Sequence, residues 1–461
     1  MDDRPATDAL GMSVEEMREL GHWVVDQVVE HFRDGAEGPA IRTGEPGRLR
    51  ELLGGPLPEG PGDPRAALRT LHGVALHHMQ HGDHPRYFAR VPGPSSYAGV
   101  LGDWLGTGFN ALAASWGGGS GPAAVELVVI EWLAKMLGLP AGTEGILVSG
   151  GSLANMTALA AARSERGPGV AYLSDQTHAS IRRGLEVLGF ATDEIHTLAT
   201  DERLRLTAAT VSAAVAADRH DGRRPGFVIA TAGTTNTGAV DELEAIAALC
   251  AAEEIWLHVD GAYGAPAAIC DAGRTALAGM ELADSLVMDP HKWLFAPYDA
   301  GIAFIRHPGT LEAAFSIAPE YLADVQRAPG TVDFGNRGLE LSRRTRAFKL
   351  WLMLQTHGAA ALRAAVARGI ELAQLAQRLI EADPGWRCVT PAQLGIVTFT
   401  RDGWDAAEHA ARVAALADDG YAALTSTSLR GRPALRMCTI NPRTTEGDIA
   451  GTLERLAAGC D

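Results

Sequence analysis

Cysteine is scarce in this 461-residue chain, and its five cysteines are widely scattered. None forms a CxxC pair and the number is odd, which argues against both a disulfide framework and a structural zinc site. The chain also lacks any run of 18 apolar residues, so we expect no membrane-spanning helix. The acidic first residues lack the apolar core of a signal peptide, and we therefore predict a cytoplasmic protein.

Positive charge is in deficit, because 40 Lys and Arg residues stand against 56 Asp and Glu residues, for a formal net charge of −16. Such a balance opposes non-specific binding to nucleic acid or to an anionic membrane. Charged residues make up 21% of the chain and hydrophobic residues 46%, so neither disorder nor a fibrous repeat fits. The length is compatible with one large domain and a smaller partner.

The sequence of the N-terminal region predicts a helix followed by an irregular arm. Ser13 and Glu16 are spaced as a capping box, and apolar residues then recur at helical spacing as far as Phe32. Between about residues 35 and 64 the density of Gly and Pro rises, which predicts irregular structure.

Four histidines follow this arm, at positions that could bind a metal on one helix face: His77, His78, His81 and His84. No nearby cysteine or carboxylate pair completes such a site. We therefore expect polar contacts or a solvated face, and no metal.

From about residue 145 the sequence alternates between short apolar runs and Ala- and Leu-rich helical stretches. The runs are 145–149, 170–174, 194–198, 227–231, 255–260 and 285–289. This alternation predicts an α/β fold with a mostly parallel central sheet and helices on both faces.

The C-terminal part has a different pattern. Helical patterns cover 339–356 and 358–381, and strand-like runs follow at 386–390, 395–400 and 434–440. We predict three parts, which are an N-terminal helical arm (1–85), a large α/β domain (86–356) and a small α+β domain (357–461).

A glycine-rich turn, from Ser149 to Asn155, lies between a predicted strand and an Ala-rich helix. Glycines let backbone amides approach an anion, and the helix N-terminus adds partial positive charge. Ser152 can add a hydroxyl donor. The segment is neither GxGxxG nor a Walker loop, so it is compatible with phosphate binding or with an ordinary turn.

Two polar segments follow other predicted strands. Asp260 lies at a carboxyl strand end, where ligands usually bind, although a loop-capping role is the alternative. Lys292 lies between His291 and Trp293, where burial would lower its pKa and favour the neutral amine that attacks carbonyls. A phosphate-binding turn, a strand-end aspartate and a reactive lysine are together what pyridoxal phosphate requires.

Here the sequence resembles the group II pyridoxal-phosphate decarboxylases, which include aromatic L-amino acid decarboxylase. The resemblance rests on DPHKWLF around Lys292, HVDGAYG around Asp260, SGGSLANMTAL at the glycine turn and SDQTHASI around His178. It runs over nearly the whole chain and is weaker after about residue 385. It implies the aspartate-aminotransferase fold (fold type I) and a homodimer with shared active sites, in which the N-terminal arm wraps the partner subunit.

The resemblance also implies a role for each site residue. Lys292 forms the Schiff base with pyridoxal phosphate, Asp260 keeps the pyridine nitrogen protonated, and His178 stacks on the ring. The other implied cofactor contacts are Gly151, Ser152, Thr231, Ala262, Asp289 and His291. The implied reaction is decarboxylation of an L-amino acid, an aromatic one being the first expectation.

One departure from the family concerns the proton donor. In well-known animal members a tyrosine on a mobile loop protonates the reacting carbon, and alignment places Phe334 there, with Tyr321 matching another family tyrosine. Phenylalanine has no proton to give, and in plant relatives this replacement accompanies oxidation to an aldehyde, ammonia and hydrogen peroxide. Either another group protonates the carbon and an amine is formed, or the oxidative route is taken.

The substrate side departs as well. Several positions that are aromatic in the aromatic amino acid enzymes are not aromatic here, and the expected substrate pocket consists of Gly82, Arg90, Val91, Pro92, Leu112 and Ala114. Losing rings leaves more room, and Arg90 either pairs with a distal polar group or faces solvent. A non-catalytic binding protein is a remote alternative, since it would be expected to have lost Lys292 or Asp260.

Overall fold

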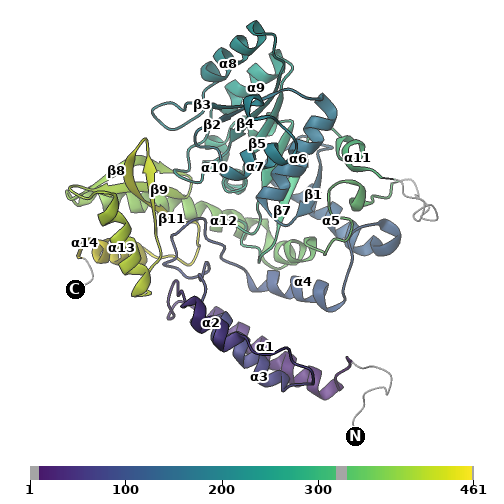
Figure 1. The fold of residues 1–461 in the computed structure, drawn as a ribbon, viewed down its shortest axis with the longest axis vertical. Coiled ribbons are helices and arrows are strands. Elements are labelled where there is room, and N and C mark those ends of the chain that lie inside the picture. The colour runs from purple at the N-terminus through teal and green to yellow at the C-terminus, as the bar shows by residue number, and fades with distance from the viewer. Residues whose placement is uncertain (1–9, 318–329, 459–461) are drawn as a thin grey trace.

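The computed structural model, which describes residues 10–317 and 330–458, contains two sheets (Figure 1). The larger sheet has seven strands in the order β1-β7-β6-β5-β4-β2-β3. Its strands are β1 (Glu144–Val148), β2 (Val170–Ser174), β3 (Ile195–Leu198), β4 (Pro225–Thr231), β5 (Trp256–Asp260), β6 (Ser285–Met288) and β7 (Gly301–Ile305). The predicted α/β fold with a mostly parallel central sheet is therefore confirmed.

The six strands predicted for this sheet are all present, each within two residues of its expected ends. The missed strand is β7, which pairs antiparallel with both β1 and β6. All five residues of β7 are buried, and its sequence shows no alternation of polar and apolar residues. A buried run this short does not distinguish a strand from a helix segment.

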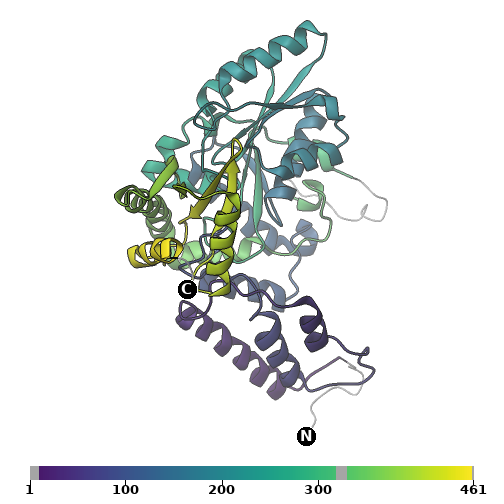
Figure 2. The same cartoon turned by 60° about the vertical axis from the view of Figure 1, so that its left-hand side comes forward.

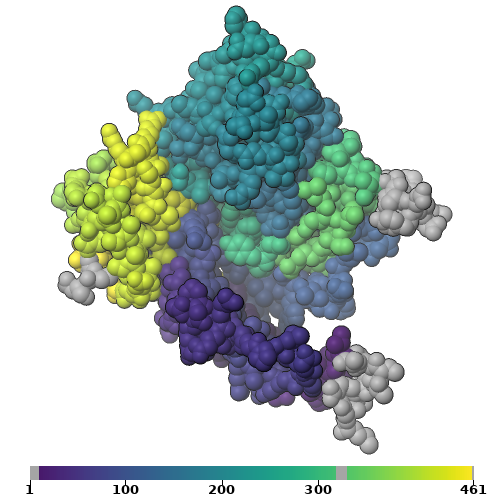
Figure 3. Space-filling view, viewed as in Figure 1, coloured from purple at the N-terminus to yellow at the C-terminus, as the bar shows by residue number. Residues whose placement is uncertain are grey.

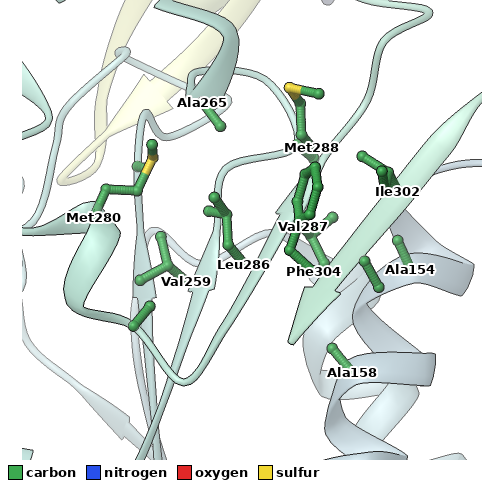
Figure 4. Packing of buried hydrophobic residues seen from close by; sticks show 14 of the residues in the cluster. Ala154, Ala158, Val259, Ala265, Met280, Leu286, Val287, Met288, Ile302 and Phe304 are labelled. Atoms are coloured by element: carbon green, nitrogen blue, oxygen red, sulfur yellow. The ribbon is translucent and has the colours of Figure 1, made fainter. Parts of the chain in front are cut away.

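Helices cover both faces of the sheet (Figures 1 and 2). The helices of this part of the chain are α4 (Tyr97–Gly108), α5 (Trp116–Leu137), α6 (Gly151–Arg166), α7 (Ala179–Val187), α8 (Ala208–His220), α9 (Leu243–Ala252), α10 (Asp271–Ala276) and α11 (Thr310–Phe315). Figure 4 shows why α6 lies so close to the sheet, since its small residues Ala154 and Ala158 face Ile302 and Phe304. This close approach fixes the N-terminus of α6 against the ends of the strands.

The smaller sheet is antiparallel, in the order β10-β11-β9-β8. Its strands are β8 (Trp386–Gln393), β9 (Ile396–Arg401), β10 (Thr425–Leu429) and β11 (Arg432–Cys438), and it packs with α12 (Ala347–Ala382), α13 (Ala406–Asp418) and α14 (Glu446–Ala458). The three predicted strands are present, and β10 was missed.

The helices predicted at 339–356 and 358–381 form one element, α12, which has non-helical backbone at Gly358 (φ 75°). Residues 339–346 are not helical, which corrects the prediction. Arg343 and Arg346 in this segment form ion pairs with Glu126 and Glu340, and these contacts hold it in an irregular path.

The N-terminal helices α1 (Val14–Asp34), α2 (Pro46–Leu53) and α3 (Pro64–Thr70) project from the body of the molecule (Figure 3). The capping box is confirmed, because Ser13 Oγ accepts from Glu16 N at 3.2 Å and Ser13 N donates to Glu16 Oε2 at 3.0 Å. None of the residues of α1 is buried within the chain.

The histidine segment makes polar contacts. His78 Nδ1 lies 2.8 Å from the carbonyl oxygen of Val74, and His84 Nε2 lies 3.1 Å from that of Gly38. No group of three or more His, Cys, Asp or Glu side chains is arranged to hold a metal ion in the part of the chain that is described. Among those same residues, no helix is both long and apolar enough to cross a membrane.

Candidate active site

Five strands of the large sheet direct their carboxyl ends at one cavity of about 350 Å³. Parallel strands place these ends at the same sheet edge, which is where α/β folds bind ligands. The cavity is lined by Ser149, Gly151, Ser152 and Asn155 after β1, His178 after β2, Thr231 at the end of β4, Asp260 and Ala262 at the end of β5, and Asp289, His291 and Lys292 after β6. All nine residues predicted to contact the cofactor therefore lie around one cavity.

Lys292 lies at the base of this cavity, with Nζ 2.8 Å from Asp289 Oδ2. Burial lowers the pKa of the Lys292 ammonium, but the Asp289 carboxylate, with a smaller effect of Asp260, outweighs burial, and the pKa lies above its ordinary value. This corrects the sequence-based expectation of a lowered pKa. That expectation considered burial alone, whereas the turn after β6 brings Asp289 back onto the lysine three residues later.

Asp260 is held by two donors. Ala262 N donates to Oδ1 at 3.0 Å, and Asn155 Nδ2 donates to Oδ2 at 3.2 Å. The side chain is almost fully buried, at 5% exposed. A buried carboxylate at this point is suited to pair with a protonated ring nitrogen, because opposite charges at short range stabilise each other strongly where water is excluded.

The N-terminus of α6 forms another part of the cavity wall. Its N-cap, Gly150, makes no side-chain capping bond. A Cβ added at Gly151 would lie 2.8 Å from Asp289 Oδ2 and 3.0 Å from the Ala262 Cβ, so only glycine allows this approach. Backbone N–H groups at a helix start, together with the Ser152 hydroxyl, are a suitable donor set for a phosphate.

Two buried polar atoms at the cavity, Thr231 Oγ1 and Asp289 Oδ1, have no hydrogen-bond partner among the described residues. Buried polar groups are nearly always paired, so unsatisfied atoms beside a cavity are expected where a polar ligand binds. The glycine cradle, the lysine, the buried carboxylate and these unpaired atoms fit pyridoxal phosphate.

His178 is the N-cap residue of α7, and its Nδ1 lies 2.8 Å from Ser180 Oγ. Its side chain is exposed at the mouth of the cavity, where a planar ligand could cover it. His291, one residue before the lysine, is buried, and Ala300 N donates to its Nδ1 at 3.1 Å. The acceptor role of Nδ1 leaves Nε2 protonated, facing Asp289 at 3.7 Å.

The predicted substrate residues are divided between two places, and none lines the cavity around Lys292. The segment with Gly82 reaches the site indirectly, because a Cβ at Gly82 would meet Gly93 N at 3.1 Å and one at Gly93 would meet Tyr298 Oη at 2.8 Å. Tyr298 in turn packs on His291, with ring centroids 4.7 Å apart.

Leu112 and Ala114 lie apart from this segment, whereas Arg90 lies within it. Leu112 lines a second cavity with Asp103 and Arg344, and Ala114 accepts a backbone hydrogen bond from Gly335 N. Arg90 is exposed, and its Nη1 donates to Gln80 Oε1 at 3.2 Å. A single chain therefore does not bring the six residues together.

Phe334 is buried in the core of a single chain. Its side chain is 0% exposed, and the Arg343 guanidinium lies 4.9 Å from the centre of its ring. Arg343 is itself buried and paired with Glu126 at 2.6 Å. In a single chain Phe334 does not line the cavity around Lys292, and its place beside the reacting carbon stays a prediction. Tyr321 lies outside the described residues.

Sequence reasoning missed Asn155 and Tyr298. Asn155 follows Gly151 by four residues, one turn later on the same face of α6, and it is the one amide in an Ala-rich helical run, which is a readable signal. Tyr298 follows Lys292 by six residues in an irregular segment, and nothing in the sequence pattern indicates its contact with His291.

The chain is similar to known proteins over most of its length. Residues 46–401 match the family described as "Pyridoxal-dependent decarboxylase conserved domain". The aromatic-L-amino-acid decarboxylase of Bacillus atrophaeus is 42% identical, over 98% of this chain and 97% of its own length. The phenylacetaldehyde synthase of Arabidopsis thaliana is 32% identical, over 84% of this chain and 83% of its own.

Solved structures agree with the fold. The crystal structure of Oryza sativa TDC with PLP and tryptamine superposes with a TM-score of 0.92, at 25% identity, over 98% of this chain and 99% of that one. The match therefore covers both sheets and the N-terminal helices. The chain belongs to the pyridoxal-dependent decarboxylase family, with pyridoxal phosphate as its cofactor.

Proposed function

We propose that this decarboxylase acts on aromatic L-amino acids and releases the corresponding amine. The observation that carries the proposal is the single cavity that Lys292, Asp260, His178 and the glycine turn share. The substrate class is supported by the 42% identity to a protein named aromatic-L-amino-acid decarboxylase.

Each residue then has a defined task. Bound pyridoxal phosphate supplies an electron sink for the pair of electrons left when the carboxylate departs. Lys292 holds the cofactor covalently. Before the cofactor binds, Asp289 lies 2.8 Å from Nζ, accepts a hydrogen bond from the lysine and stabilises its protonated form. Asp260 supplies the negative charge that keeps the ring nitrogen protonated. His178, exposed at the mouth, covers the ring face and orients the substrate carboxylate.

We propose the amine as the product. The 42% identity to a protein named aromatic-L-amino-acid decarboxylase supports it, and Phe334 does not line the cavity around Lys292 in a single chain. A proton for the reacting carbon must come from another group, and the Lys292 ammonium, His178 or water can supply it. The relative named phenylacetaldehyde synthase makes peroxide formation the outcome to test against.

We further propose a homodimer with shared active sites, in which residues 1–85 contact the partner subunit and residues 86–356 and 357–461 form the two domains. Apolar side chains of α1, of α4 and of the residue that follows α4 are exposed in a single chain, among them Met17 at 53%, Trp104 at 52% and Phe109 at 80%. Exposed apolar surface of this extent marks an interaction site. A second copy would cover it and could supply the Leu112 side of the substrate pocket.

The experiment is a substrate panel on the purified protein with pyridoxal phosphate, following carbon dioxide, amine and hydrogen peroxide together. We expect carbon dioxide and amine in equal amounts from an aromatic L-amino acid, without peroxide, and little turnover of glutamate. Stoichiometric peroxide would overturn the amine assignment, and preference for an acidic amino acid would overturn the substrate class. Light scattering of the same sample tests the dimer, and a monomeric mass would contradict it.

A further inference from the structure

A row of polar side chains runs along β5 beneath Asp260. Side chains alternate along a strand, so Trp256, His258 and Asp260 share one face of the sheet. All three are 5% exposed or less. Ser285 on β6 is the register partner of His258, and Asn155 projects from α6 onto the same face. Five polar side chains are thus stacked in the protein interior.

These side chains form one unbroken hydrogen-bonded chain. Trp256 Nε1 donates to Ser285 Oγ at 2.9 Å, and Ser285 Oγ lies 2.8 Å from His258 Nδ1. His258 Nε2 lies 2.9 Å from Asn155 Oδ1. Asn155 Nδ2 then donates to Asp260 Oδ2 at 3.2 Å.

The two ends of this chain fix its direction. An indole N–H only donates, so Ser285 Oγ accepts from Trp256 and is free to donate to His258 Nδ1. An ionised carboxylate only accepts, so Asn155 turns its NH₂ to Asp260 and its oxygen to His258. The imidazole is therefore protonated on Nε2, and every hydrogen points towards Asp260.

The histidine in the middle is neutral. Burial lowers the pKa of His258 to about 4, despite the nearby Asp260. A protonated imidazole would also place a second hydrogen on Nδ1, against the hydrogen that Ser285 donates. The hydrogen-bonded side chains therefore direct aligned dipoles at the Asp260 carboxylate, and none of them carries a charge.

We propose that Asn155, His258, Ser285 and Trp256 are positioning residues that hold the Asp260 carboxylate correctly oriented for the cofactor ring nitrogen. This inference rests on the proposed role of Asp260. A buried carboxylate is stabilised in its charged form by donors, and a donor whose own acceptor is occupied is polarised and binds more strongly. Removing the Asn155 amide would leave Asp260 with the Ala262 amide as its only donor in the described structure.

The first test separates this role from simple packing. Asn155→Leu removes the side chain that donates to Asp260. Trp256→Phe keeps an aromatic ring at that position but removes the indole N–H, the first donor in the row of hydrogen bonds. Val259→Ala is the matched control, since Val259 lies between His258 and Asp260 on the opposite face and is also fully buried. Affinity is measured for pyridoxal phosphate and for an analogue with a C–H group in place of the ring nitrogen.

We expect Asn155→Leu to weaken binding of pyridoxal phosphate about tenfold, as for a hydrogen bond to a charged group. The analogue, which cannot use Asp260 as a partner, should bind the variant and the wild type alike. Trp256→Phe should show the same selectivity with a smaller effect, and Val259→Ala should show none. Equal losses for both ligands would show a packing effect and overturn the proposal.

The second test uses the cofactor-free wild-type protein. Nitrogen-15 NMR of histidine, with the His258 signals assigned from their absence in His258→Gln, should show a neutral ring protonated on Nε2 near neutral pH. A ring protonated on Nδ1, or on both nitrogens, would overturn the proposal. A wild-type protein that binds no pyridoxal phosphate would instead contradict the proposed function, so the two failures are distinguishable.

Discussion

Replacing Asp289 with asparagine should accelerate capture of the cofactor by Lys292. In the wild type the lysine ammonium is paired with Asp289 at 2.8 Å, and this pair raises the lysine pKa although burial lowers it. Only the neutral amine attacks an aldehyde. Without the Asp289 carboxylate, only the smaller effects of Asp260 and Tyr298 oppose burial, so the lysine pKa falls and the fraction of neutral amine at a given pH increases.

The magnitude follows from the contact. A hydrogen bond to a charged partner contributes about 1.5–3 kcal/mol, and the lower end applies here because the Lys292 side chain is 25% exposed. Since 1.4 kcal/mol corresponds to about a factor of ten, covalent capture near neutral pH should be about tenfold faster. The gain should shrink as the pH is raised, because the wild-type lysine then becomes neutral as well.

The assay mixes cofactor-free protein with pyridoxal phosphate and follows the visible absorbance of the lysine-bound cofactor. Pyridoxal, which lacks the phosphate, is run in parallel, because relief of repulsion between Asp289 and the phosphate would accelerate only the phosphorylated ligand. Asp419→Asn, which removes an exposed ion pair with Arg455, is the matched control. Unchanged or slower capture of both ligands would refute the reasoning.

Three further predictions concern other residues. Asp260→Ala should lower the decarboxylation rate by about 10²–10³-fold in a carbon dioxide assay, the usual cost of losing one preorganised electrostatic group, and near-normal turnover would contradict its role. Phe334→Tyr should leave the ratio of amine to peroxide unchanged and lower the melting temperature, because it adds a hydroxyl to an enclosed ring; a shifted product ratio would show that the ring does reach the substrate. Burial raises the pKa of Asp241 to about 7, so this residue by itself should lower the free energy of unfolding by roughly 4 kcal/mol as the pH rises from about 4 to about 7, whereas buried His258, with its pKa lowered to about 4, acts in the opposite direction. Urea titrations should show that the wild type loses about this much stability relative to Asp241→Asn over that pH range.

The sequence predicted the parts of the fold that depend on local pattern. Strand β5 and the Ser13 cap could be located because an apolar run and a capping box are each contained within a few residues. Strand β7 could not be located from the sequence. Its antiparallel place between β1 and β6 depends on pairing with both strands, and β1 lies more than 100 residues earlier in the sequence. Residues 339–346 are irregular for a similar reason, since their arginines pair with distant carboxylates.

Some features of the candidate site can likewise be predicted from the sequence, and others depend on the fold. Glycines at a helix start, a strand-end aspartate and a lysine between aromatic residues are recognisable in sequence, and the structure gathers them around one cavity. The sign of the Lys292 pKa shift could not be obtained from sequence, because it depends on whether the Asp289 carboxylate folds back onto the amine. The burial of Phe334 was equally hidden, since its partner Arg343 is itself held by Glu126 on another helix.

The covalent attachment of the cofactor tests the central claim most directly. The chain contains three lysines, Lys135, Lys292 and Lys349. Borohydride reduction of the protein with bound pyridoxal phosphate, followed by peptide mass spectrometry, should place the phosphopyridoxyl group on Lys292 alone and on no lysine in Lys292→Ala. Labelling of Lys135 or Lys349 in place of Lys292, or no label at all, would contradict the account.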